Sequence, residues 1–265
     1  MRLILALDCG NTRLKWGLHD GGGWRAQGTA PLGGNPHSDR GVNDPARGLH
    51  DPARGVNEPA RGLAQLAAAW ARLPRPNRII VANVAGAGAR AVIEAALAGM
   101  AAAPHWLTPR ANQCGVSNGY LDPAQLGADR WAALIAARHM HGGPALVINA
   151  GTATTIDVLS GEGVFRGGVI LPGLDLMKRS LAAGTADLPL TSGSFTEEPR
   201  NTADAIESGA LQAHAGAIER MYARLPAGGV CFLSGGAALK IAGRLAVPVR
   251  VIENLVLEGL VRIAA

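Results

Sequence analysis

The chain has 265 residues, 48% of them hydrophobic and 17% charged, which is typical of a soluble globular protein. It contains no apolar run of 18 residues and begins without a signal-peptide pattern, so we expect neither a membrane span nor export. The net charge is +5, but its basic residues are scattered, so no nucleic-acid surface is expected. Three widely spaced cysteines indicate a reducing, cytoplasmic location.

The start of the chain predicts a meander of three strands. Residues 3–8 form a continuous apolar run, as in a strand that is buried on both faces. After a short turn, residues 13–18 alternate between apolar and mostly basic side chains, which indicates a second strand. Residues 24–30 follow a glycine-rich turn and are the third expected strand.

A seven-residue repeat follows the meander. Residues 42–48, 49–55 and 56–62 each contain the sequence Pro-Ala-Arg-Gly after an acidic residue. Proline and glycine in every copy exclude a coiled coil. We therefore predict a mobile surface insert over about residues 35–62.

The next part of the chain alternates between helix and strand patterns. An aspartate followed by proline is a strong helix-start signal, so a long helix is expected from Asp122-Pro123 to about His141. The other expected elements are helices at 63–73 and 89–100 and strands at 77–84 and 104–109. This alternation predicts an α/β architecture.

The first hairpin has an echo in the second half of the chain. Residues 6–18 align with residues 147–159, which places Asp8 on Asn149, Gly10 on Gly151 and Asn11 on Thr152. Further expected strands at 163–171, 229–234 and 247–252 and a helix at 254–264 complete a second copy. Small-residue turns of this kind expose main-chain N–H groups, so two such hairpins facing a cleft are suited to bind a polyphosphate.

Several motifs in this order resemble one enzyme family. The turns "DCGNT", "GTATTID" and "SGG" are similar to the nucleotide-binding loops of the acetate kinase–sugar kinase–Hsp70–actin superfamily. The stretches "GYLDPAQLGADRWAAL", "GGVILPG", "GTADLP" and "NLVLEGL" more narrowly resemble type III pantothenate kinase. The similarity covers nearly the whole chain except the heptad insert.

The resemblance implies two duplicated ribonuclease H-like α/β domains, the actin-like ATPase fold, with an interdomain cleft. The domains would span residues 1–142 and 143–265. The implied reaction is ATP-dependent phosphorylation of pantothenate to 4′-phosphopantothenate, the first step of coenzyme A biosynthesis, in a cytoplasmic homodimer that uses magnesium. Two alternatives stay open: a regulator similar to Bvg accessory factor, and a superfamily kinase for another small alcohol or acid.

The resemblance also implies an ATP site on the hairpins. Asp8 would hold Mg²⁺ through water, because Mg²⁺ keeps much of its hydration shell. Lys15, on the polar face of the second strand, would neutralise phosphate charge. The full set of expected ATP-binding residues is Asp8, Cys9, Gly10, Asn11, Thr12, Arg13, Leu14, Lys15 and Thr152.

The acceptor site is implied by the "GADR" motif. Asp129 resembles the catalytic base that takes the hydroxyl proton, and Arg130 is suited to bind the pantothenate carboxylate. Without the resemblance, this pair would be read as a solvated Asp-Arg pair on a helix. The expected substrate-binding residues are Tyr120, Gly127, Ala128, Asp129, Arg130 and Thr185, the last reaching the neighbouring subunit's substrate.

Asn149 departs from the family pattern. Relatives commonly carry aspartate at this position, where it helps to bind K⁺ or NH₄⁺. An amide oxygen can still coordinate a cation, but it adds no negative charge. We therefore expect a weaker monovalent-cation requirement than in relatives with aspartate.

Overall fold

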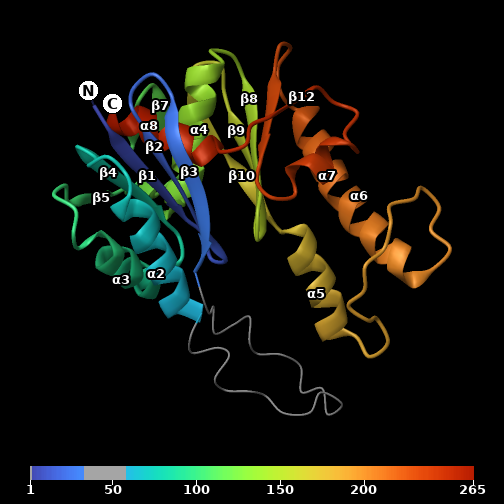
Figure 1. Ribbon diagram of the computed structural model, residues 1–265. Coiled ribbons are helices and arrows are strands. Elements are labelled where there is room, and N and C mark those ends of the chain that lie inside the picture. The colour runs from blue at the N-terminus through green and yellow to red at the C-terminus, as the bar shows by residue number, and fades with distance from the viewer. Residues whose placement is uncertain (1, 33–57) are drawn as a thin grey trace. The chain divides into compact units, whose positions relative to one another are not determined.

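The computed structural model describes residues 2–32 and 58–265 (Figure 1). Packing divides the chain into two compact units: unit 1 comprises Met1–Pro109, Ala124–Ala133 and Val256–Ala265, and unit 2 comprises Arg110–Pro123 and Leu134–Leu255. The boundary expected between residues 142 and 143 follows the internal duplication rather than the packing, and it stays a prediction. Within the described residues, no helix combines the length and hydrophobicity needed to cross a membrane.

Unit 1 contains a sheet of five strands in the order β3-β2-β1-β4-β5. The strands are β1 (Ile4–Cys9), β2 (Arg13–His19), β3 (Trp24–Pro31), β4 (Arg78–Asn83) and β5 (Pro104–Trp106). The first three are antiparallel neighbours, which confirms the predicted meander, and β4 and β5 are added in parallel. The unit thus begins with hairpins and continues through helical crossovers.

One hydrophobic cluster of unit 1 lies on one face of this sheet. Leu5, Leu7 and Cys9 alternate along β1 and pack with every second residue of β2 and with buried side chains of α2 (Glu58–Ala71) and α3 (Gly86–Leu97). These two helices lie side by side in Figure 1. Asp8 therefore points to the opposite face of the sheet, because neighbouring strand residues alternate in direction.

Helix α2 corrects one expectation. It begins at Glu58, inside the third heptad copy, so the prediction that the insert continues as a loop to residue 62 is wrong for residues 58–62. Proline is tolerated in the first turn of a helix, because the main-chain N–H groups of that turn have no hydrogen-bond acceptor within the helix. The remainder of the predicted insert, residues 35–57, lies outside the described residues.

Unit 2 contains a sheet of seven strands in the order β12-β11-β8-β9-β10-β7-β6. The strands are β6 (Asn112–Gln113), β7 (Val116–Asn118), β8 (Ala145–Ala150), β9 (Ala153–Leu159), β10 (Val164–Pro172), β11 (Val230–Ser234) and β12 (Val249–Val251). Five of them repeat the order and directions of the first sheet. The small β6–β7 hairpin was not predicted, because strands this short carry little periodicity.

The two halves of the chain correspond residue by residue from the start of β1 and β8 to the turn that follows each strand. Strands β1 and β8 occupy positions 141 residues apart at both ends, so Asp8 does correspond to Asn149. The second turn is one residue shorter: Gly10 N–H donates to Arg13 O, whereas Gly151 N–H donates to Ala153 O. The alignment therefore shifts by one residue in β9.

The helices of unit 2 cover one face of its sheet. The helices on this face are α5 (Leu174–Gly184), α6 (Thr202–Tyr222) and α7 (Ala238–Ala242), and their buried residues pack with alternate residues of β8 and β11. This arrangement repeats the cluster that β1, α2 and α3 form in unit 1. Asn149, like Asp8, alternates with the core-facing residues of its strand.

Helix α4 (Ala128–Met140) starts later than predicted. Pro123–Gln125 form only a 3₁₀ turn, and the first α-helical hydrogen bond runs from Trp131 N–H to Gly127 O. Asp129 therefore lies in the first turn of the helix. Helix α8 (Leu255–Ala264) crosses α4 closely at Gly259, where a Cβ would lie 1.8 Å from Ala132 O. Only glycine fits this approach, which fixes the helix that carries Asp129.

Candidate active site

The turn between β1 and β2 places a carboxylate opposite an amine. Asp8 and Lys15 are direct register partners on the antiparallel pair, so their side chains share one face of the sheet. Gly10 N–H closes the turn by donating to Arg13 O at 3.1 Å. The residues at the tip are exposed: Asn11, Thr12 and Arg13. The turn thus presents polar groups next to a half-buried acid.

Two of the expected ATP-binding residues have side chains that cannot reach a ligand at the turn. The side chains of Cys9 and Leu14 are fully buried in the core of unit 1. Burial also raises the pKa of the Cys9 thiol to about 12. Any contact of these two residues with a phosphate is therefore limited to their main-chain atoms.

Asp129 lies directly after two residues with little or no side chain, Gly127 and Ala128. Its Oδ1 atom accepts a hydrogen bond from the Arg130 main-chain N–H at 2.8 Å. A Cβ on Gly127 would lie only 2.6 Å from that same Oδ1 atom. The missing side chain at Gly127 is thus what allows the carboxylate to fold back over the main chain. Ala128 and Arg130 are both 6% exposed.

The charge of Asp129 influences the pKa of Asp8. The pKa of Asp8 is raised to about 7. Burial is the largest cause, the charge of Asp129 adds to the rise, and the charge of Lys15 opposes it. Burial also raises the pKa of Asp129, against the hydrogen bond and charge of Arg130. Two acids with raised pKa values favour the arrival of a cation or a proton-donating substrate.

In unit 2, the residue that corresponds to Asp8 has neutral register partners, while Asp157 of β9 lies on the same sheet face two residues beyond one of them. Asn149 has Thr155 of β9 and Ser234 of β11 as its register partners. Ser234 Oγ donates to Glu253 O at 3.3 Å. Thr152 is exposed at the tip of the shorter turn. The duplicated hairpin therefore keeps its shape but carries amide and hydroxyl groups in place of the Asp8 charge.

The remaining expected substrate residues also belong to unit 2. Tyr120 is partly buried, and its ring lies 5.1 Å from that of Phe165. Thr185 is exposed at the end of α5, where its hydroxyl donates to Leu181 O at 2.8 Å. Their roles toward a substrate stay predictions.

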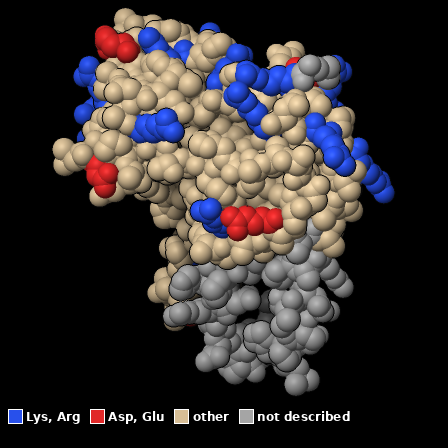
Figure 2. Space-filling model, turned by 90° about the vertical axis from the view of Figure 1, so that its left-hand side faces the viewer, with Lys and Arg blue, Asp and Glu red and all other residues tan. Residues whose placement is uncertain are grey.

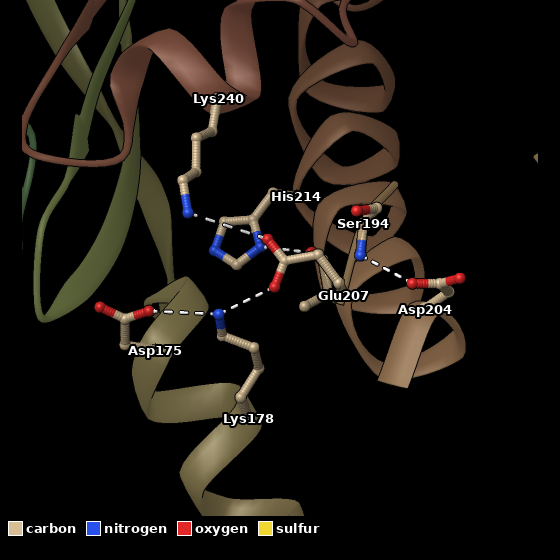
Figure 3. Close-up of polar contacts among 8 residues, drawn as sticks. Asp175, Lys178, Ser194, Asp204, Glu207, His214 and Lys240 are labelled. Carbon is tan, nitrogen blue, oxygen red and sulfur yellow. Dashed lines mark hydrogen bonds and ion pairs between the residues drawn. The ribbon is translucent and has the colours of Figure 1, made fainter. Parts of the chain in front are cut away.

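Unit 2 also contains a charged cluster that the sequence did not indicate (Figure 3). Glu207 of α6 is buried and binds Lys178 Nζ of α5 at 2.8 Å, while Lys240 Nζ lies at 3.9 Å. Lys178 also lies 3.4 Å from the exposed Asp175. The Lys178–Glu207 ion pair connects α5 to α6. No local sequence signal predicts this pair, because its two residues are far apart in the chain.

The same helix carries a fully buried histidine. His214 Nδ1 lies 2.7 Å from Ala210 O, and Nε2 lies 3.0 Å from Thr154 Oγ1. A carbonyl oxygen can only accept, so Nδ1 donates to Ala210 O, and Nε2 is paired with the threonine hydroxyl. This arrangement fastens α6 to β9 and leaves neither ring nitrogen for catalysis.

Comparison with solved structures defines the fold class. A Campylobacter jejuni protein described as belonging to the Baf family of transcriptional activators matches with a TM-score of 0.55 and 19% identity, over 98% of this chain and 96% of its own. MreB5 of Spiroplasma citri, solved with ADP, matches with a TM-score of 0.51 and 12% identity, over 98% and 95%. The fold is that of the actin-like ATPases.

Sequence comparison defines the family within this class. The model of type III pantothenate kinase matches residues 4–224. The type III pantothenate kinase of Aromatoleum aromaticum is 46% identical over 99% of this chain and 98% of its own. The chain belongs to the type III pantothenate kinase family.

Proposed function

We propose that this protein transfers the terminal phosphoryl group of ATP to the 4′-hydroxyl of pantothenate, the first step of coenzyme A biosynthesis. The observation that carries the proposal is the pair formed by Asp8 and Asp129 in unit 1. They come from the end of the first strand and the start of α4, and the charge of Asp129 raises the pKa of Asp8. Family membership supports the same reaction.

Asp129 is the residue we assign to accept the hydroxyl proton. Its pKa is raised by burial, and a base with a pKa nearer the working pH is more effective. The Arg130 main-chain N–H holds Oδ1, so we assign proton acceptance to Oδ2. Phosphoryl transfer needs mainly positioning and charge stabilisation, which the fixed first turn of α4 supplies.

The hairpin turn of unit 1 is assigned to the phosphates. Asn11, Thr12 and the main chain of the turn would donate hydrogen bonds, and Lys15 would add positive charge. Among the described residues, no group of three His, Cys, Asp or Glu side chains could form an all-protein metal cage. Asp8 alone fits Mg²⁺, which binds through few carboxylates and keeps its waters. Bound Mg²⁺ would neutralise charge that develops on the phosphate oxygens.

The other assignments extend the resemblance. Thr152 would donate to phosphate from the second turn. Tyr120 and the buried Arg130 would bind the acceptor. Thr185 would contact the substrate of the neighbouring subunit in a cytoplasmic homodimer. The direct register partners of Asn149, Thr155 and Ser234, are both neutral, which supports a weaker K⁺ or NH₄⁺ requirement than an aspartate at this position would give.

A coupled ADP-release assay with pantothenate tests the proposal. Wild type should show pantothenate-dependent turnover, and Asp129→Asn should reduce kcat by about 10²- to 10⁴-fold while the protein stays folded. Asp175→Asn is the matched control, since Asp175 also lies in a first helical turn but its side chain is 79% exposed. Absence of turnover in wild type would refute the function, and full activity of Asp129→Asn would refute the base.

A regulatory role is the competing interpretation, because one fold neighbour is described as a transcriptional activator. That likeness is at 19% identity and concerns the fold alone. On the face that Figure 2 shows, basic side chains of the described residues lie in separate groups with uncharged surface between them. A regulator would bind nucleic acid without pantothenate turnover, so the same assay separates the two interpretations.

A further inference from the structure

An apolar side chain lies on the same sheet face as Asp8. Ala82 of β4 is the register partner of Asp8, and Val84 follows two residues later, where side chains return to the same face. Val84 N–H donates to Cys9 O at 3.0 Å, which continues the β1–β4 pairing past the end of β4. Val84 is therefore fixed beside the strand end that carries Asp8.

Val84 and the Asp129 carboxylate converge on Gly127. The point that a Cβ would occupy on Gly127 lies 2.6 Å from Asp129 Oδ1 and 3.7 Å from Val84 Cγ1. The third atom near that point is Cδ of Arg130, at 3.8 Å. Of these three neighbours, only Val84 is an apolar residue. It is partly exposed, so its methyl groups keep surface that a ligand can contact.

The acceptor of the proposed reaction has an unusual shape at its reactive end. The 4′-hydroxyl of pantothenate sits on a methylene that is bonded to a quaternary carbon with two methyl groups. A hydroxyl within hydrogen-bond reach of Asp129 must bring these methyl groups close to the same carboxylate. Methyl groups gain no favourable free energy from a place beside two carboxylates. Contact with a branched apolar side chain is favourable, because it removes apolar surface from water.

We propose that Val84 is a specificity-determining residue that contacts the two methyl groups of the acceptor. This inference rests on the proposed function and deepens it, because it states which feature of the acceptor is selected. The duplicated strand supports it: β11 in unit 2 is followed by Gly235 and Gly236, and no atom lies within 4 Å of a Cβ position on Gly236. An apolar side chain is thus present only in the copy that carries Asp129.

The test compares pantothenate with an analogue in which hydrogens replace the two methyl groups. We expect wild type to prefer pantothenate in kcat/KM by about 10-fold or more, since one methylene in an apolar pocket is worth roughly 10- to 200-fold. Val84→Thr keeps the side-chain shape but adds a hydroxyl, so it should lower that preference by about 10-fold. The loss should fall on pantothenate, mainly in KM, and leave the analogue unchanged.

Two further variants keep the test decisive. Val84→Ile enlarges the side chain and should also reduce the preference, by excluding the methyl groups. Val251→Thr is the control, because Val251 is 40% exposed at the edge of the unit 2 sheet and should leave both substrates unaffected.

The outcomes separate this inference from the proposed function. Equal losses on both substrates, or no change in preference for either Val84 variant, would overturn the role of Val84 while pantothenate turnover by wild type upholds the function. Absence of pantothenate turnover in wild type would overturn both.

Discussion

Replacing Asp8 with asparagine should stabilise the protein while it removes activity. Asp8 is half-buried beside the charge of Asp129, and its pKa is raised from 3.8 to about 7. The folded state therefore binds more protons than the unfolded state between pH 4 and 7. Its free energy of unfolding must fall as the pH rises through this window. Asparagine has nearly the same shape and never ionises, so Asp8→Asn escapes this loss.

The size of the effect follows from the shift. One pKa unit corresponds to about 1.36 kcal/mol, so the rise to about 7 sets an upper limit of roughly 4 kcal/mol above pH 8. Part of this cost is already present at pH 5, because the unfolded carboxyl is ionised there. The advantage of Asp8→Asn should therefore grow by about 2 to 3 kcal/mol between pH 5 and 8.5.

Urea unfolding of both proteins at pH 5 and 8.5 measures this difference, and the ADP-release assay measures the loss of activity. Asp20→Asn is a control of opposite sign: hydrogen bonds from Gly22 and Gly23 and the nearby Arg25 lower the pKa of Asp20 to about 2. It should be less stable than wild type at neutral pH, with the difference disappearing as the pH falls toward 2. An Asp8→Asn variant that is no more stable than wild type at pH 8.5 would refute the reasoning.

Three other predictions concern the surroundings of the site. Gly127→Ala should displace the carboxylate that lies 2.6 Å from the new Cβ and lower kcat by about 10-fold or more, whereas Gly88→Ala, in open space on α3, should not. Glu207→Gln should lower the free energy of unfolding by about 1 to 2 kcal/mol in urea titrations, because Lys178 would lose its ionised partner at 2.8 Å and keep only the exposed Asp175 at 3.4 Å. Asn149→Asp should steepen activation by K⁺ in the kinase assay. An unchanged kcat in Gly127→Ala, an unchanged free energy of unfolding in Glu207→Gln, or the same K⁺ activation in Asn149→Asp as in wild type would each contradict the corresponding expectation.

The local elements were largely predictable from sequence. Strand β1 and its copy β8 are continuous apolar runs that end in the same polar turn, and their 141-residue offset holds at both strand ends. Helix starts were less predictable. The Asp122-Pro123 signal produced only a 3₁₀ turn, and α4 began at Ala128. Capping signals act over one turn and are overridden where tertiary packing favours another start.

The amino-acid sequence by itself determined the strand pattern, the duplicated turn, the family and the polar residues expected in the site, because these depend on side-chain type and spacing along the chain. Only the tertiary structure showed that Asp129 acts on Asp8, that Val84 lies against Gly127, and that Glu207 pairs with Lys178. A pKa depends on burial and on charges brought near by folding. Likewise, an apolar wall beside a carboxylate exists only once a strand end and a helix start, far apart in the chain, have met.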